Sequence, residues 1–122
     1  MAYKQEYQAS VEDPQAFWRD KASLIHWFKP AQQVLSVDQQ GIHHWFADGE
    51  LNTCYLALDY HVDNGRADQT ALIYDSPVTG SQQKFSFREL RDEVARCAGM
   101  LRQLGVDKGD RVIIYLPMIP QA

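Results

Sequence analysis

The chain has 122 residues, of which 45% are hydrophobic and 23% are charged, and its formal net charge is −4. This composition is typical of a folded globular protein, and the length corresponds to one domain or part of one. Residues 1–60 carry four basic and eight acidic side chains and residues 61–122 carry eight of each, so neither half has the basic excess that nucleic-acid binding requires.

The amino-terminal part contains a predicted helix. Asp13-Pro14 is typical of a helix start, because the Asp side chain caps free backbone amides and Pro fits the first helical turn. We expect Pro30 to end this helix. We expect its polar face to point outward, with Arg19, Asp20 and Lys21 on it.

The following segment is expected to be irregular and then helical. Residues 31–42 are rich in Gln and have no apolar period, so we expect them to cross the surface. Trp45-Phe46 is a short apolar pair. Asn52 can cap a second helix, which Asn64-Gly65 is expected to end.

The apolar period then changes to that of strands. Residues 70–74 and 84–87 are expected to form an antiparallel hairpin around the loop of residues 75–80. Ser86 and Glu89 have the spacing of a capping box, in which each side chain accepts a hydrogen bond from a free amide at a helix start.

The helix that follows has the clearest pattern in the chain. Its apolar residues recur every three or four positions and define a face expected to be buried, comprising Phe87, Leu90, Val94, Cys97, Ala98, Leu101 and Leu104. Arg88–Asp92 and Asp92–Arg96 are expected to pair on the outer face. We expect Gly99 to permit close helix packing and Gly105 to end the helix in a left-handed conformation.

A buried strand is expected over residues 111–116, and Pro120 is placed as in the first turn of another helix. The expected fold class is mixed α/β, with amino-terminal helices over residues 1–66 and an incomplete strand–hairpin–helix–strand unit over residues 67–122. Because the pattern stops where another element would begin, we expect the chain to be the front piece of a larger protein. Its exposed apolar surface is then expected to favour self-association.

The sequence favours a cytoplasmic protein that does not enter a membrane. No apolar run approaches the roughly 18 residues of a membrane span, and no apolar stretch follows a basic amino terminus. Cys54 and Cys97 are far apart, and Cys97 on a buried helix face suits a reduced thiol better than a disulfide.

Residues with metal-binding or phosphate-binding chemistry do not form a recognisable site. His43 and His44 are adjacent and would point to opposite faces of a strand, and no Cys-x-x-Cys or His-x-x-x-His spacing is present. Gly99, Gly105 and Gly109 lie within or after a helix, whereas a phosphate loop needs glycines before one.

Nucleophiles give no site either. Ser76, Ser81 and Ser86 lie in a loop or a cap, and none is in a Gly-x-Ser-x-Gly turn. We therefore assign no catalytic, cofactor-binding or metal-binding residue. An aromatic group is expected to belong to the core or to an interface, and it comprises Phe17, Trp18, Trp27, Phe28, Trp45 and Phe46.

Several motifs, in this order, resemble the amino-terminal region of acetyl- and propionyl-CoA synthetases. They are Asp13-Pro14 with Phe17-Trp18, Trp45-Phe46 with Gly49, Leu51 and Asn52, and Leu58-Asp59 with His61. Later motifs are similar to the start of the adenylate-forming domain: Phe85, Phe87 and Glu89-Leu90, then Leu104-Gly105-Val106 with Lys108-Gly109-Asp110-Arg111-Val112, then Tyr115 with Pro117-Met118-Ile119-Pro120. The resemblance covers residues 5–122. The family commonly has Arg where this chain has Tyr60. Residues 52–55 and 71–79 look closer to the propionyl type.

The resemblance implies a ligase that activates a short carboxylic acid with ATP and Mg, releases pyrophosphate, and transfers the acyl group from AMP to CoA. It implies that the phosphate loop, the acid pocket and the catalytic lysine lie outside residues 1–122, so this piece binds no cofactor and is structural. Its main partner is then the remainder of its own adenylate-forming domain. Two alternatives remain open: a free-standing protein-interaction module that uses the aromatic group, and a piece that binds a nucleotide by itself.

Overall fold

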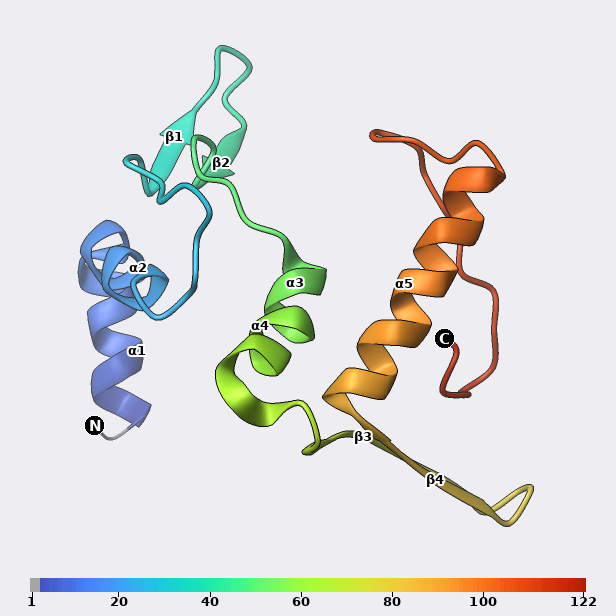
Figure 1. Cartoon of the computed structure of the whole chain (residues 1–122). Helices are drawn as coiled ribbons and strands as arrows, with labels where there is room; N and C mark the ends of the chain where they lie inside the picture. Colours follow the sequence, from blue (N-terminus) through green and yellow to red (C-terminus); the bar gives the residue numbers. More distant parts are fainter. Residues whose placement is uncertain (1–2) are drawn as a thin grey trace. The chain divides into compact units, whose positions relative to one another are not determined.

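The computed structural model describes residues 3–122, and the chain in it divides into two compact units. The first unit extends to Thr53 and the second runs from Cys54 to Ala122 (Figure 1). Helices and two small antiparallel sheets make up the regular structure, which confirms the mixed α/β class. Among the described residues, only Val34, Leu58 and Ala67 are buried, so neither unit has an extensive core.

Two helices open the first unit, α1 (Tyr3–Glu12) and α2 (Pro14–Ala22). Asp13 caps α2 as predicted, because its Oδ1 accepts the amide of Ala16 at 3.0 Å. The prediction that this helix extends to Pro30 is wrong. The indole Nε1 of Trp27 donates to the Ala22 carbonyl at 2.8 Å, which satisfies a free carbonyl at the helix end.

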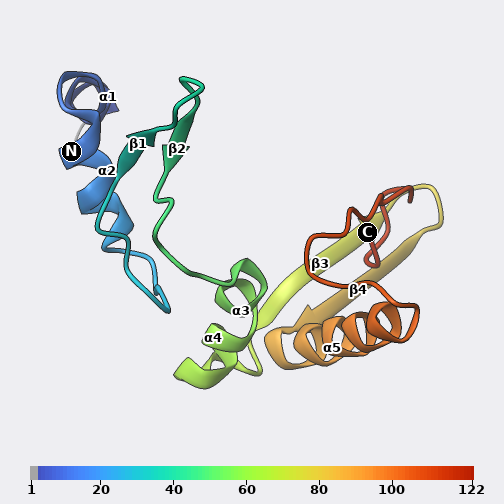
Figure 2. The same ribbon diagram turned by 90° about the horizontal axis from the view of Figure 1, so that it is seen from above.

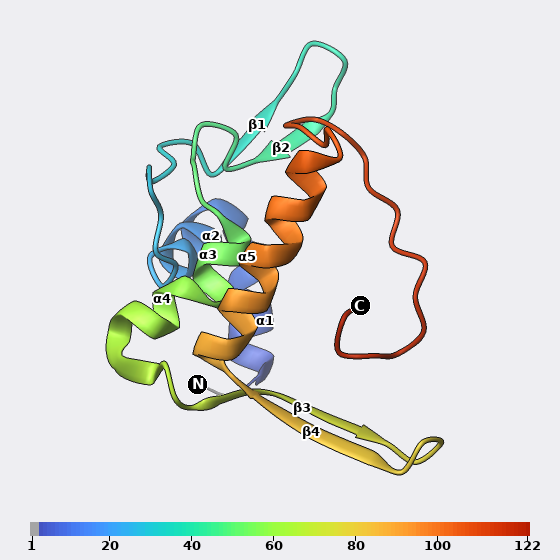
Figure 3. The same cartoon turned by 45° about the vertical axis from the view of Figure 1, so that its right-hand side comes forward.

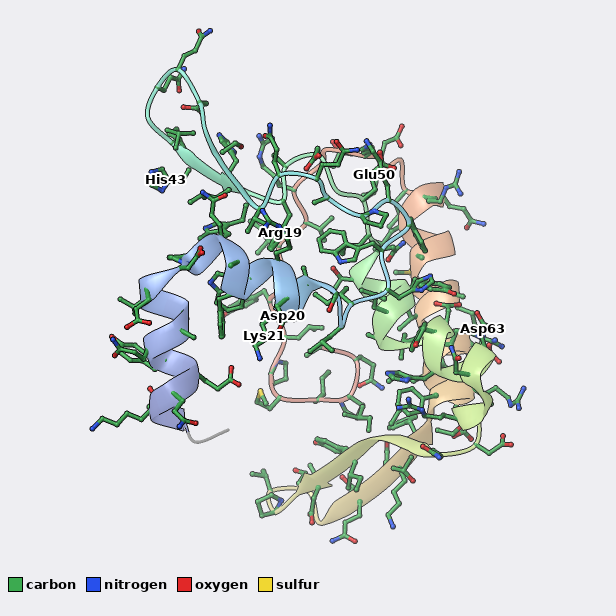
Figure 4. The ribbon with its side chains drawn as sticks, turned by 90° about the vertical axis from the view of Figure 1, so that its left-hand side faces the viewer. Arg19, Asp20, Lys21, His43, Glu50 and Asp63 are labelled. Carbon is green, nitrogen blue, oxygen red and sulfur yellow. The ribbon has the colours of Figure 1, made fainter. Side chains whose placement is uncertain are left out.

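The outer face of α2 is also less exposed than predicted. Lys21 is half-buried because its Nζ lies 2.9 Å from a carboxylate oxygen of Glu6 on α1. Arg19 and Asp20 are exposed, as expected, and Figure 4 shows all three side chains on α2. The helix α1, which has few apolar residues, was not predicted from the sequence.

A hairpin of β1 (Leu35–Val37) and β2 (His43–Trp45) replaces the irregular crossing predicted for residues 31–42. Leu35 pairs with Trp45 and Val37 with His43 in antiparallel register. The loop is closed by Asp38, whose Oδ1 accepts the amides of Gln40 at 2.8 Å and Ile42 at 2.9 Å. Such local capping by Asp stabilises a turn without any apolar pattern.

The second predicted helix is divided into three short segments. They are α3 (Thr53–Ala57), α4 (Asp59–His61) and a π-helical turn, η1 (Val62–Arg66). The interruption lies at Leu58, whose backbone leaves the helical region at φ −127° and ψ −70° while its side chain is buried. The expected end at Asn64-Gly65 is confirmed, and Gly65 has a φ of 77°.

The predicted hairpin is present as β3 (Thr70–Ser76) and β4 (Ser81–Ser86), which pair antiparallel with a bulge between Thr70 and Leu72. The strands extend further than predicted, so the connection between them is shorter. Helix α5 (Phe87–Gln103) follows directly and contacts both strands (Figure 2).

Both predicted ends of α5 are confirmed. The Ser86–Glu89 capping box is formed at its start. At its end Gly105 is left-handed at φ 89°, and the amide of Val106 donates to the Leu101 carbonyl at 3.1 Å. The last turn of the helix is thus closed in the manner of a Schellman motif.

Other predictions for α5 are wrong. Arg88 contacts Asp68, Asp92 contacts Arg91, and Arg96 contacts Glu93, so neither predicted i,i+4 pair forms. Cys97, Ala98 and Leu104 are exposed, and nothing lies within 4 Å of a Cβ placed on Gly99. The reason is that no described element covers the carboxyl-terminal half of the apolar face.

The strand predicted for residues 111–116 is absent from the described structure, and the helix start at Pro120 is a turn instead. Figure 3 shows the segment after α5 running apart from the helix. Residues 111–116 make no hydrogen bond to any described residue. A strand needs a neighbour for its backbone groups, and none is placed beside this segment.

Candidate interaction surfaces

Five of the six predicted aromatic residues form a continuous cluster in the first unit. Phe17 contacts Trp18 edge-on with ring centres 5.2 Å apart, and Trp18 contacts Trp45 at 6.3 Å. Phe46 lies 6.1 Å from Trp45 and 5.6 Å from Trp27. We call these five residues the aromatic cluster. The sixth residue, Phe28, is edge-on to His26, with ring centres 6.2 Å apart.

Backbone constraints hold the cluster in place. Phe46 has a φ of 51°, a conformation that is uncommon for a bulky residue, and its amide donates to the carbonyl of buried Val34 at 2.9 Å. Gly49 allows Trp27 to approach, because a Cβ at Gly49 would lie 2.7 Å from the indole Cζ3. Asp48 accepts the amides of Gln32 and Gln33 and thereby fixes the neighbouring segment.

The aromatic cluster remains open to solvent. Trp18 is 43% exposed and Trp45 is 46% exposed. A hollow of about 380 Å³ lies between Trp18, Trp45 and Phe46. A second hollow of about 330 Å³ is lined by residues that include Arg19, Trp27 and Phe46. Exposed aromatic rings gathered around hollows are typical of an interface with another polypeptide segment.

The second unit has its own apolar hollow of about 980 Å³, between strand β3 with the following loop and residues 117–120. Several of its apolar side chains are strongly exposed: Ile73 at 65%, Val78 at 92% and Met118 at 91%. Each unit therefore presents apolar surface to solvent.

The four histidines lie in separate environments. His44 Nε2 lies 2.9 Å from an Asp38 oxygen, whereas His43 is exposed on β2 (Figure 4). His61 lies 4.5 Å from the ring of Phe87, and its Nδ1 is buried without a hydrogen-bond partner in the described structure, a feature the sequence did not indicate. Within residues 3–122 no group of three or more His, Cys, Asp or Glu residues could hold a metal ion.

The cysteines are free thiols, and the predicted serines have local structural contacts, with Ser76 and Ser81 paired across the β3–β4 hairpin. Cys54 and Cys97 are exposed free thiols, which contradicts the buried position expected for Cys97. Ser86 caps α5, and Ser76 accepts the amide of Thr79 in the hairpin loop. No helix within residues 3–122 has the length and apolar character needed to cross a bilayer.

The carboxyl groups whose pKa is lowered, those of Asp38, Asp48 and Glu89, stabilise turns and a helix end. The hydrogen bond from His44, followed by the amide of Ile42, holds the pKa of Asp38 below its ordinary value. The Gln32 amide lowers the pKa of Asp48, and the Ser86 amide lowers the pKa of Glu89. Burial, with Asp63 nearby, raises the pKa of Tyr55. Asp38 and Glu89 are bonded within their own turn or cap, whereas Asp48 joins its turn to the segment at Gln32 and Gln33. The bonds of all three carboxylates therefore serve structure.

Two family models match the chain one after the other. The model described as acetyl-coenzyme A synthetase N-terminus matches residues 3–57, and the model described as AMP-binding enzyme matches residues 59–122. Together they follow the order of the motifs quoted from the sequence.

Individual proteins are also similar in sequence to this chain over all or nearly all of its length. An uncharacterised protein of Pseudomonas aeruginosa is 56% identical over all 122 residues, which are 19% of its length. The mitochondrial acyl-CoA synthetase short-chain family member 3 of Homo sapiens is 46% identical, and the acetyl-coenzyme A synthetase of Desulfatibacillum aliphaticivorans is 45% identical. Each match covers 98% of this chain and, respectively, 18% and 19% of the relative, so the chain spans about a fifth of the length of these relatives. The chain therefore belongs to the AMP-binding enzyme family, with an acetyl-coenzyme A synthetase N-terminus over residues 3–57 preceding the AMP-binding region over residues 59–122.

Proposed function

We propose that this chain is the amino-terminal part of an AMP-forming ligase that joins a short carboxylic acid to CoA. The observation that carries the proposal is the pair of adjacent family matches, which together extend from residue 3 to residue 122. Relatives that are 45–46% identical over 98% of the chain have names that specify acyl-CoA or acetyl-coenzyme A synthetases.

In the proposed reaction of the whole protein, the carboxylate oxygen attacks the α-phosphorus of ATP and pyrophosphate leaves. The thiol of CoA then attacks the acyl carbon and AMP leaves. Such a reaction depends on alignment of the reacting groups and on stabilisation of phosphate charge, which Mg supports when it is bound with ATP. We place the residues that bind ATP, acid and CoA outside residues 1–122.

The proposed role of residues 1–122 is therefore structural. Calorimetric titration of ATP or CoA into the isolated chain should show no saturable heat. A saturable isotherm in the micromolar range would contradict this role and would favour a piece that binds a nucleotide by itself.

We propose that the aromatic cluster packs against the remainder of the same polypeptide. Trp45 is 46% exposed, so it has apolar surface left to bury. Trp45→Ala should lower the unfolding free energy of the full polypeptide by about 3–5 kcal/mol, as for a buried Trp, and that of the isolated chain by much less. Tyr3→Ala is the control, because Tyr3 is 83% exposed and lies outside the aromatic cluster. Equal losses for Trp45→Ala in both polypeptides would refute this packing.

A free-standing interaction module is the alternative, and the exposed Trp18 and Trp45 are the observation that favours it. Reading the encoding gene distinguishes the two. A reading frame that continues past Ala122 into a Ser/Thr/Gly-rich phosphate loop supports the ligase, whereas a natural stop codon supports the module.

Three finer proposals accompany the ligase. Residues 52–55 and 71–79 look closer to the propionyl type, so we expect kcat/KM of the full polypeptide to be higher with propionate than with acetate, and an equal or reversed preference would refute this.

We propose a cytoplasmic location, which fractionation of the native cell would test. We also propose functional regions at residues 1–66 and 67–122. Limited proteolysis near residue 66 would support that division, and cleavage near Thr53, where the compact units divide, would contradict it.

A further inference from the structure

The contact between α4 and the start of α5 contains a buried nitrogen without a partner. The ring of His61 on α4 lies 4.5 Å from the ring of Phe87, the first residue of α5. The ring of Tyr60 lies edge-on to His61 at 5.7 Å. The His61 Nδ1 is buried and makes no hydrogen bond in the described structure. Figure 2 shows α4 beside the start of α5. The imidazole therefore packs among aromatic rings.

This contact lies where α5 begins. The amide of Phe87 donates to the Gln69 carbonyl at 3.1 Å, and the amide of Arg88 donates to the carbonyl of buried Ala67 at 3.0 Å. These bonds join the first turn of α5 to the segment that follows η1, and the ring of His61 adds a side-chain contact from α4. Loss of the ring contact should therefore loosen α4 and the first turn of α5 together.

The protonation state of His61 decides whether the contact is favourable. In a neutral imidazole one nitrogen is an acceptor, and a buried acceptor without a partner is tolerated better than a buried N–H. Protonation makes both nitrogens donors, so it would place an N–H and a positive charge at the buried Nδ1. Because atoms of this chain enclose Nδ1, the remainder of the polypeptide cannot supply an acceptor while the contact stays closed.

The charged groups of the neighbouring elements do not supply this acceptor either. The titratable and charged residues of α4, η1 and the first turns of α5 are Asp59, Tyr60, Asp63, Arg66, Arg88, Glu89, Arg91 and Asp92. Those with side-chain bonds elsewhere are Asp63, Arg88, Glu89 and the pair Arg91–Asp92. Asp59 would attract an imidazolium, but within residues 3–122 neither it nor any other group bonds to Nδ1.

We propose that His61 makes the contact between α4 and α5 acid-sensitive: the neutral imidazole packs on Phe87, and protonation opens the contact. An imidazole in water takes up its proton near pH 6.5. Since the closed contact disfavours the protonated ring, its stability is complete above about pH 6.5 and falls as the pH drops below that value. This inference goes beyond the proposed ligase function and does not depend on it.

Hydrogen–deuterium exchange of the complete gene product tests the proposal, with rates corrected for the intrinsic effect of pH on amide exchange. Between about pH 7.5 and pH 5.5, the opening equilibrium of residues 59–66 and 87–91 should increase by about five- to tenfold, because opening allows one proton to bind. An increase of less than about twofold would overturn the proposal, because linkage to one proton near pH 6.5 requires more.

Two neutral variants show whether His61 is the group that takes up the proton. His61→Phe keeps an aromatic ring against Phe87, and His61→Gln keeps a polar group, but neither side chain titrates. Both variants should remove the increase in opening at low pH. His43→Phe is the matched control, because His43 is exposed on β2 in the first unit, and this variant should retain the increase. A full increase in either His61 variant, or its loss in His43→Phe, would overturn the proposal.

Discussion

Replacing Ser86 with Ala tests whether the capping box stabilises α5 as its geometry indicates. The Ser86 hydroxyl accepts the amide of Glu89 at 3.3 Å, and the Glu89 carboxylate accepts both the amide and the hydroxyl of Ser86 at 2.8 Å. The 3.3 Å bond is long for an amide donor. We therefore expect a loss from the lower part of the range for N-caps, about 0.5–1 kcal/mol.

Urea unfolding followed by far-UV circular dichroism measures this loss. With an m-value of about 1–3 kcal/mol/M, the midpoint should fall by about 0.2–1 M. Ser86→Asp is the matched variant, because Asp caps helices as well as Ser does and should keep most of the stability. An unchanged midpoint for Ser86→Ala, or an equal loss for Ser86→Asp, would refute the assignment of the cap.

The titration of Glu89 gives an independent result. Its pKa lies below the ordinary value of 4.5, mainly because of the Ser86 amide and then the Ser86 hydroxyl. The stabilisation by this carboxylate is therefore complete above pH 4.5 and is lost as the pH falls through the lowered pKa. Ser86→Ala removes the hydroxyl only, so the pKa measured by NMR should rise but stay below 4.5.

Four further predictions concern local contacts. Gly49→Ala should destabilise the chain by about 1–3 kcal/mol in urea unfolding, because a Cβ there meets Trp27 at 2.7 Å. Gly99→Ala should stabilise the chain by about 0.5–1 kcal/mol, because Gly99 lies in the interior of α5 and no atom lies within 4 Å of the added Cβ. A stabilising Gly49→Ala together with a destabilising Gly99→Ala would contradict the surroundings assigned to the two glycines. We expect the β1–β2 hairpin to lose structure below pH 3.8, where the Asp38 carboxylate bonded to His44 becomes protonated. Asp38→Asn should remove this acid transition, because the variant has no carboxylate to protonate. An unchanged acid transition in the Trp45 NMR signals would count against this role of Asp38. A double-mutant cycle with Glu6→Gln and Lys21→Met should give a coupling of at most about 1 kcal/mol that disappears in 1 M salt, and a salt-independent coupling would exclude a simple ion pair.

The parts of the fold that sequence predicted correctly are those with local causes. Asp13 caps α2, Ser86 and Glu89 cap α5, and Gly105 ends α5, all through contacts within a few residues. The β3–β4 hairpin also joins neighbouring segments. Such elements can be read from spacing because each one includes its own hydrogen-bond partners.

Two of the predictions that failed depended on contacts with more distant parts of the polypeptide. The strand at residues 111–116 and the buried position of Cys97 both require a covering element, and the described structure places none over them. The β1–β2 hairpin was missed for another reason. Its turn depends on hydrogen bonds to Asp38 rather than on an apolar alternation. The aromatic cluster was identified as a group, but its connected contacts and its exposure needed the structure.

Acid-dependent ATP–pyrophosphate exchange tests the central proposal most directly. It should be measured with the complete gene product that contains these 122 residues and, in parallel, with the isolated chain. We predict exchange that requires a short-chain acid such as propionate or acetate in the complete protein, and none in the isolated chain. Absence of exchange with any short-chain acid in the folded complete protein, or acid-dependent exchange by the isolated chain, would contradict the proposed function.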